Sequence, residues 1–143
     1  MKSSEKVILL VHPLGYSAQS AQDDISRMAN IMPPLGLASI SAYLTDKGLE
    51  NDIIDCYAHP DSDKLIIDYI QRENPPYIGF SCTTSSFLDG ERLARLAKSI
   101  LPDIKTVFGG PHVSALCESV IVDNPSIDYT VIGEGEETRR QPL

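Results

Sequence analysis

Short apolar runs alternate along the chain with segments in which apolar residues recur every three or four positions. The short runs are too brief for a helix, and several are rich in Val, Ile, Tyr or Phe, which favours β-strands. They are Val7–Val11, Asp52–Ile54, Tyr77–Phe80, Thr106–Phe108 and Tyr129–Ile132. The pattern therefore predicts five strands.

The segments between these runs carry apolar stripes at helical spacing. The stripes are Leu37, Ile40 and Leu44; Leu65, Ile66, Tyr69 and Ile70; Leu93, Leu96, Ala97 and Ile100; and Val113, Leu116, Cys117 and Val120. Residues that end helices follow the first three stripes, at Lys47-Gly48, Asn74-Pro75-Pro76 and Leu101-Pro102. We expect each stripe to pack one helix face against a sheet.

Alternation of strands and helices with short connections predicts right-handed βαβ units. The expected fold class is therefore α/β, with a doubly wound open parallel five-stranded sheet of flavodoxin-like or Rossmann-like type. The connection from His12 to Pro33 is the exception, because strand-to-helix loops usually have about two to six residues. A long loop after the first strand is expected to be functional, although it could instead be a poorly ordered insertion.

Composition limits the classes of protein to which the chain can belong. A length of 143 residues suits one domain, and a net charge of −8 disfavours nucleic acid and anionic lipid as partners. No apolar stretch approaches the roughly 20 residues of a membrane span, and residues 1–6 lack the apolar run of a signal peptide. We expect a cytoplasmic protein without a membrane or nucleic-acid partner.

Cysteine and histidine provide no recognisable catalytic or metal-binding motif. The three cysteines are odd in number and widely spaced, so they support neither a disulfide framework nor a four-thiolate metal site, and we expect them to be reduced and mostly structural. The three histidines, His12, His59 and His112, have no Cys or carboxylate partner at metal-ligand spacing. The sequence thus predicts neither a metal site nor catalysis within this chain.

Small and hydroxylic residues follow the predicted strands, whose carboxyl ends face the ligand crevice in open parallel sheets. The corners read His12-Pro13-Leu14-Gly15, Ser81-Cys82-Thr83-Thr84-Ser85-Ser86, Gly109-Gly110-Pro111-His112 and Gly133-Glu134-Gly135. Such residues let a ligand approach the backbone closely and offer N–H groups and hydroxyls. The convergence predicts a site for a large ligand with polar appendages. Any single glycine could instead serve turn geometry, and His112 could be an imidazole that only packs in a turn.

Two other functions of similar folds lack their required residues at these corners. A phospho-accepting receiver needs acidic residues where Val11-His12 and Ser81-Cys82 stand, and a dinucleotide-binding domain needs G-x-G-x-x-G where the chain reads His12-Pro13-Leu14-Gly15. A flavin site stays open, because the hydroxyl-rich loop Thr83–Ser86 could wrap a phosphate.

An ordered set of short motifs carries a resemblance to a known family. The motifs are Met32-Pro33-Pro34-Leu35-Gly36-Leu37-Ala38, Gly79-Phe80-Ser81, Phe108-Gly109-Gly110-Pro111-His112 and Val131-Ile132-Gly133-Glu134-Gly135-Glu136. With these separations the chain resembles the cobalamin-binding domains that precede the catalytic barrel in cobalamin-dependent radical S-adenosylmethionine proteins. The resemblance covers residues 6–138, leaving 1–5 as an N-terminal extension and 139–143 as a tail in which the closing helix is truncated.

The resemblance implies that cobalamin binds with its nucleotide tail between the strand ends and its corrin ring over the loops around Leu14, Thr83 and Gly133. A benzimidazole tail needs a slot without side chains, which Gly79, Ser81, Gly109 and Gly110 would supply. The implied cofactor-binding residues are Leu14, Gly15, Ser81, Cys82, Thr83, Thr84, Gly109, Gly110, Pro111, His112, Gly133 and Gly135.

Two departures refine what the resemblance implies. The chain lacks the Asp-x-His-x-x-Gly motif with which many cobalamin domains ligate cobalt, so the lower face of the cobalt is expected to have no protein histidine and could be covered by Leu14. It also lacks Cys-x-x-x-Cys-x-x-Cys, so the [4Fe–4S] cluster and S-adenosylmethionine are expected only in a downstream barrel domain. The expected parent is a methyltransferase-type radical enzyme of which this chain alone is not the enzyme.

Two alternatives remain open from the sequence. One is a non-catalytic cobalamin sensor or carrier domain, which a downstream signalling module would indicate. The other is a flavin- or nucleotide-binding domain of the same fold, which the absorption spectrum of the bound ligand would distinguish.

Overall fold

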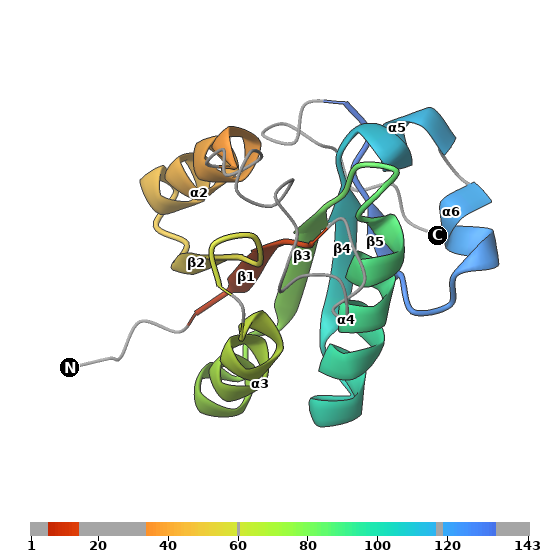
Figure 1. Ribbon diagram of the computed structural model, residues 1–143. Coiled ribbons are helices and arrows are strands. Elements are labelled where there is room, and N and C mark those ends of the chain that lie inside the picture. Colours follow the sequence, from red (N-terminus) through yellow and green to blue (C-terminus); the bar gives the residue numbers. More distant parts are fainter. Residues whose placement is uncertain (1–5, 15–33, 60, 117–118, 134–143) are drawn as a thin grey trace.

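Five parallel strands form one open sheet in the computed structural model, which describes residues 6–14, 34–59, 61–116 and 119–133 (Figure 1). The strands are β1 (Ile8–His12), β2 (Asn51–Asp55), β3 (Tyr77–Ser81), β4 (Lys105–Gly109) and β5 (Tyr129–Thr130). Their order is β2-β1-β3-β4-β5, so the winding reverses between β1 and β3. The predicted α/β class and five-stranded parallel sheet are confirmed.

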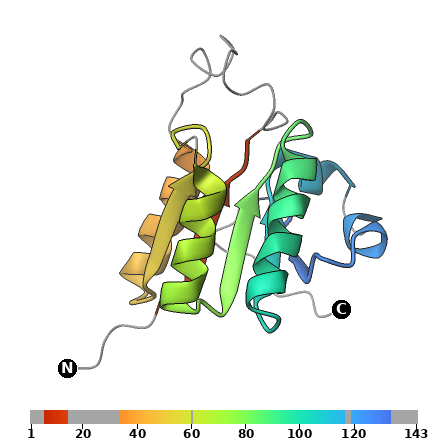
Figure 2. The ribbon, with the colours of Figure 1, turned by 60° about the horizontal axis from the view of Figure 1, so that its bottom comes forward.

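Helices lie on both faces of this sheet, as Figure 2 shows from a second direction. They are α2 (Leu35–Asp46), α3 (Ser62–Glu73), α4 (Phe87–Ile100), α5 (Pro111–Leu116) and α6 (Ser119–Asp123). Helices α3 and α4 cover one face, and α2 lies on the opposite face over β1 and β2. We call the first the packed face and the second the α2 face.

The helix ends follow the predicted signals. Helix α3 stops at Asn74, which adopts the left-handed conformation with φ 45°, and Gly48 after α2 also has a positive φ of 75°. Leu101 caps α4 just before Pro102. Asparagine and glycine are the residues that take this conformation at low cost, so these stops are local properties of the sequence.

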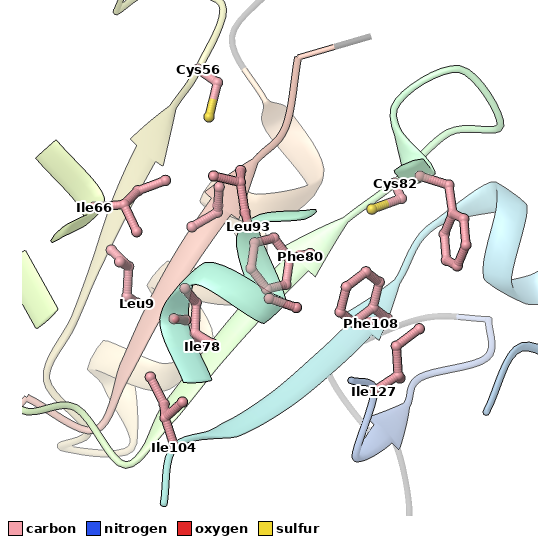
Figure 3. Close-up of a cluster of buried hydrophobic side chains, with 14 of the residues drawn as sticks. Leu9, Cys56, Ile66, Ile78, Phe80, Cys82, Leu93, Ile104, Phe108 and Ile127 are labelled. Atoms are coloured by element: carbon pink, nitrogen blue, oxygen red, sulfur yellow. The ribbon is translucent and has the colours of Figure 1, made fainter. Parts of the chain in front are cut away.

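The hydrophobic core lies on the packed face (Figure 3). Leu9 of β1, Ile78 of β3 and Phe108 of β4 are fully buried there, because alternate strand residues point to the same side. The rings of Phe80 and Phe108 lie 4.8 Å apart between centroids. Apolar burial at about 25 cal/mol per Å² makes this cluster the main source of stability.

Two of the three cysteines belong to this core. Cys56 and Cys82 are free thiols with almost no exposed surface, and burial raises the pKa of Cys56 to about 11 and that of Cys82 to about 12. Both therefore stay protonated and structural at neutral pH, as expected. Cys117 lies outside the described residues.

Two of the predicted helical stripes pack differently from the prediction. The fourth stripe is not one helix but the two short helices α5 and α6, and Leu116 is 48% exposed whereas Val113 and Val120 are buried. The first stripe buries Leu37, but Ile40 and Leu44 of the same stripe are only partly buried. The reason is that the α2 face holds a groove beside this helix.

No helix in the described ranges is long and apolar enough to span a bilayer.

Candidate functional site

A groove of about 430 Å³ opens on the α2 face of the sheet. Its floor is formed by three neighbouring strands, mostly by alternate residues. One wall comes from α2, and the end of the groove lies at the carboxyl edge of the sheet. The residues of the floor are Ile8, Leu10, Gly79, Phe80, Ser81, Val107 and Gly109. The α2 wall consists of Gly36, Leu37, Ile40 and Leu44, and the end of the groove is lined by Gly110, Pro111, Val131 and Gly133. Only Ser81 among them has a polar side chain, so the groove suits an apolar group.

Strand register brings the smallest residues together on the floor. Gly79 pairs with Val107 and Ser81 with Gly109, so small residues stand side by side along β3 and β4. A Cβ on Gly79 would come within 3.3 Å of both Leu10 and Ile8, whereas a Cβ on Gly109 would meet only Val131, at an ordinary 3.5 Å. A side chain at Gly79 would therefore require the terminal methyl groups of Leu10 and Ile8 to move by a few tenths of an ångström. A Cβ at Gly109 would require no such shift, so the packing of the fold does not demand glycine there.

Gly110 is required by the backbone rather than by the groove. Its φ is +102°, and a Cβ there would lie 2.6 Å from the carbonyl oxygen of Cys82. The same corner is fixed by two hydrogen bonds, from Cys82 N–H to the Gly109 carbonyl (2.9 Å) and from His112 N–H to the Cys82 carbonyl (3.3 Å). Gly110 therefore allows the backbone that follows β4 to lie close to the backbone that follows β3.

The hydroxyl-rich loop before α4 bonds largely to itself. The Ser86 hydroxyl accepts a hydrogen bond from Thr83 N–H at 3.0 Å, and the hydroxyls of Thr83 and Ser85 lie 3.0 Å apart. His112 Nδ1 is 3.2 Å from the Thr84 hydroxyl, and its ring lies 4.5 Å from that of Phe87. The imidazole thus connects the start of α5 to this loop at the carboxyl edge.

The structure divides the sequence-predicted site residues into three groups. Ser81, Gly109, Gly110, Pro111 and Gly133 line the groove, and Thr83, Thr84 and His112 lie at the carboxyl edge without lining it. Cys82 and Leu14 pack against the core, and the Leu14 N–H donates to an Asp89 carboxylate oxygen at 3.1 Å. The Cys82 side chain is thus fully buried in the core, and its assignment to the cofactor site stays a prediction. Gly15 and Gly135 lie outside the described residues.

Sequence reasoning missed the helical wall of the groove and one polar pair. The helix itself was predicted from its apolar stripe, but Leu37, Ile40 and Leu44 were expected to pack on the sheet rather than to line a groove. The pair is His12 and Asp55, whose Nδ1 and Oδ1 atoms lie 3.1 Å apart although the residues are separated by 43 positions in the sequence. We expected no carboxylate partner for His12 from its spacing. The partner comes from β2, and only the strand order places β2 beside β1.

Comparison with known families places this groove in context. The family model described as the B12 binding domain matches residues 22–143. The chain belongs to the B12-binding domain family. Membership of this family implies that the cofactor of the domain is cobalamin. The resemblance found in the sequence is therefore confirmed at the level of the family, and the flavodoxin-like fold is confirmed by the strand order.

Several curated proteins are similar to this B12-binding domain. It is 36% identical over 137 residues to a protein named as an uncharacterized methyltransferase from Pyrococcus horikoshii, a match that covers 94% of this chain and 28% of that protein. It is 30% identical over 131 residues to an anaerobic magnesium-protoporphyrin IX monomethyl ester cyclase from Rubrivivax gelatinosus, covering 91% and 22%. A cobalamin-dependent radical SAM methyltransferase, TokK of Streptomyces tokunonensis, is 32% identical over 69 residues, covering 48% and 10%. The chain thus spans about a quarter or less of these relatives' lengths.

The residues of the groove fit the nucleotide tail of cobalamin. A benzimidazole is flat and largely apolar, and the lining is apolar except for one hydroxyl. At Gly109 a Cβ would meet only Val131, so the groove is open beside this part of β4. Ligand pockets typically measure about 300–1,000 Å³, which includes the volume found here.

Proposed function

We propose that this chain is the cobalamin-binding module of a radical S-adenosylmethionine enzyme of methyltransferase type. In this proposal it presents base-off cobalamin to a catalytic barrel in a different part of the protein. Support comes from the B12-binding family match and from the relatives, two of which are named as methyltransferases. The [4Fe–4S] cluster and S-adenosylmethionine would belong to that barrel and not to the residues described here.

The observation that carries the proposal is the groove floor made of Gly79, Ser81 and Gly109. A tail inserted there cannot also coordinate cobalt, which is why we propose the base-off form. The Ser81 hydroxyl, next to Gly109 in register, can hydrogen-bond a polar atom of the inserted tail. Residues at the carboxyl edge, Thr83, Thr84 and Pro111 among them, would then face the corrin ring.

Each part of this chain has a limited task in that function. Bound cobalamin supplies a cobalt that can carry a methyl group or assist electron transfer. The protein residues bind and orient it, and the apolar groove excludes water from the tail. The Leu14 N–H bond to Asp89 fixes the backbone where the chain leaves β1, below the place that we propose for the ring.

Titration with hydroxocobalamin tests the proposal, with the absorption change of the base-off form as the readout. We expect Gly109→Val to weaken binding roughly tenfold to over a hundredfold, since accommodating two methyl groups beside a packed ligand costs about 1–3 kcal/mol or more. Gly109→Ala should weaken it less and leave the unfolding free energy within about 0.5 kcal/mol, because its Cβ meets only Val131.

Gly110→Val is the control for damage to the fold. From sequence alone Gly109 and Gly110 look equivalent, but the positive φ and the contact with Cys82 predict that Gly110→Val destabilises the protein itself. If both Gly109 variants fold and bind hydroxocobalamin as tightly as the native chain, the tail does not enter this groove. Flavin mononucleotide is the competing ligand, and tighter binding of flavin than of cobalamin would overturn the proposal.

A further inference from the structure

His12 is the last residue of β1 and lies at the carboxyl edge on the groove side of the sheet. Alternation along β1 places it on the same face as Ile8 and Leu10, both of which line the groove. Its side chain is 25% exposed, and that of Asp55, its partner in register, is 17% exposed. Both are therefore partly buried. Neither lines the groove itself, but His12 follows Leu10 by two residues on the strand that forms part of the groove floor.

Several contacts hold the imidazole in place. Asp55 Oδ1 lies 3.1 Å from His12 Nδ1 and accepts a second hydrogen bond from Tyr57 N–H, also at 3.1 Å. The Tyr57 ring centroid is 5.1 Å from that of His12, and Cys56 N–H donates to the His12 carbonyl at 3.0 Å. A carboxylate only accepts, so the tautomer that bonds to Asp55 carries its hydrogen on Nδ1, and Nε2 is the ring nitrogen that this bond does not use.

Among the described residues that line the groove, none has a charged side chain and only Ser81 has a polar one. Ser81 stands at the same level of the sheet as His12, because Val11 pairs with Phe80 and each residue is the next along its strand. The two polar groups thus lie on neighbouring strands where the apolar floor ends. This arrangement would suit a ligand whose apolar ring lies on the floor of the groove and whose ribose phosphate lies next to Ser81 and His12.

We propose that His12, positioned by Asp55, binds the ribose phosphate segment of the nucleotide tail, an inference that rests on the proposed function. Nε2 can donate to a phosphate oxygen in the charged form or accept from a ribose hydroxyl in the neutral form, and both groups are adjacent in a nucleotide. In this proposal His12 favours cobalamin over corrinoids that lack the nucleotide tail, and Asp55 is a positioning residue that orients the His12 ring. Neither is proposed to touch cobalt.

The test compares hydroxocobalamin with cobinamide, which has the corrin ring but no ribose phosphate and no benzimidazole. We expect the native chain to prefer hydroxocobalamin. His12→Ala should weaken hydroxocobalamin about tenfold, the effect of one or two lost hydrogen bonds, and leave cobinamide unchanged. His12→Gln should restore part of the loss, and Asp55→Asn should lower the preference by a smaller factor. His59→Ala, an exposed histidine, is the matched control and should change neither affinity.

The outcomes separate the two proposals. If the native chain binds neither ligand, the proposed function fails. If it binds both equally, the tail is not recognised and the inference is overturned, although the chain still binds the corrin. If the native preference is strong and His12→Ala keeps it, the inference alone is overturned. If His12→Ala weakens both ligands equally, or removes nitrogen splitting from the cobalt(II) paramagnetic resonance spectrum, His12 contacts the corrin or the metal and the inference is also overturned.

Discussion

The two faces of one sheet differ although the same strands form both. On the packed face Phe80 and Phe108 meet in the core, and on the α2 face the residues that follow them, Ser81 and Gly109, leave a groove. Helices α3 and α4 cover the first face, and α2 covers only part of the second. The comparison indicates that one face supplies stability and the other supplies space for a ligand.

The largest expected effect comes from matched substitutions at adjacent residues of β1. Leu9 is fully buried in the core, and Leu10, 4% exposed, borders the groove. Leu9→Ala should lower the free energy of unfolding by about 3–5 kcal/mol, because it leaves an enclosed cavity. Leu10→Ala should cost about 2 kcal/mol, because the space it leaves joins an open groove. Urea denaturation at pH 7 measures both.

Equal losses in the two variants would contradict the comparison. They would mean that the α2 face is packed as tightly as the other and that the groove is not a separate feature of the fold. A Leu9 variant too unstable to fold can be replaced by Leu9→Val, which should show a smaller loss in the same order.

The sequence predicted most of the fold because strand alternation and helix ends are local properties. Asn74 and Gly48 could be assigned from their own preferences, without knowledge of the sheet. The α5 and α6 region was harder, because a helical stripe from Val113 to Val120 does not reveal that Leu116 points to solvent. Its packing depends on contacts with α4 and β4 that no local pattern contains.

The site was predictable only where it depends on strand ends. Ser81 and Gly109 are the last residues of β3 and β4, and parallel strands bring their carboxyl ends to one edge. Cys82 was assigned with its neighbours, yet the same alternation that points Ser81 into the groove points Cys82 into the core. The pairing of His12 with Asp55 depends on the strand order, which the apolar pattern leaves undetermined.

A partly buried polar cluster is the exception on the packed face and gives the second prediction. Asp128 accepts hydrogen bonds from Lys98 Nζ (2.6 Å) and Thr106 N–H (2.9 Å), and the Thr106 side chain is fully buried. Burial opposes ionisation of Asp128, but the hydrogen bonds from Lys98 and Thr106 outweigh it, so the pKa of Asp128 is lowered from its ordinary value of 3.8. Lys98→Met should cost about 1–2 kcal/mol of unfolding free energy at pH 7.

The pH dependence of that cost follows from linkage. Because the folded pKa of Asp128 is lower than the unfolded one, its stabilisation is fully present above the unfolded value of about 4 and is lost as the pH falls through the folded value. The gap between native and Lys98→Met unfolding curves should therefore narrow in acid. A gap that stays constant from pH 7 to pH 2.5 would show that Lys98 acts only through packing.

The smallest predicted effect on stability comes from two glycines at opposite ends of α2. A Cβ at Gly36 or at Gly48 would meet no heavy atom within 4 Å, but Gly36 is helical and lines the groove, whereas Gly48 has φ +75° and does not line it. Gly36→Ala should raise the free energy of unfolding by about 0.5 kcal/mol, since alanine loses less backbone entropy in a helix. Gly48→Ala should lower it by about 1 kcal/mol, because the left-handed conformation disfavours a side chain.

Hydroxocobalamin titration then separates stability from binding: Gly36→Ala should bind a few-fold more weakly although it is more stable, and Gly48→Ala should bind as the native chain does. If binding follows stability in both variants, α2 is not a wall of the cobalamin site, and the α2 face differs from the packed face only in how loosely it is covered.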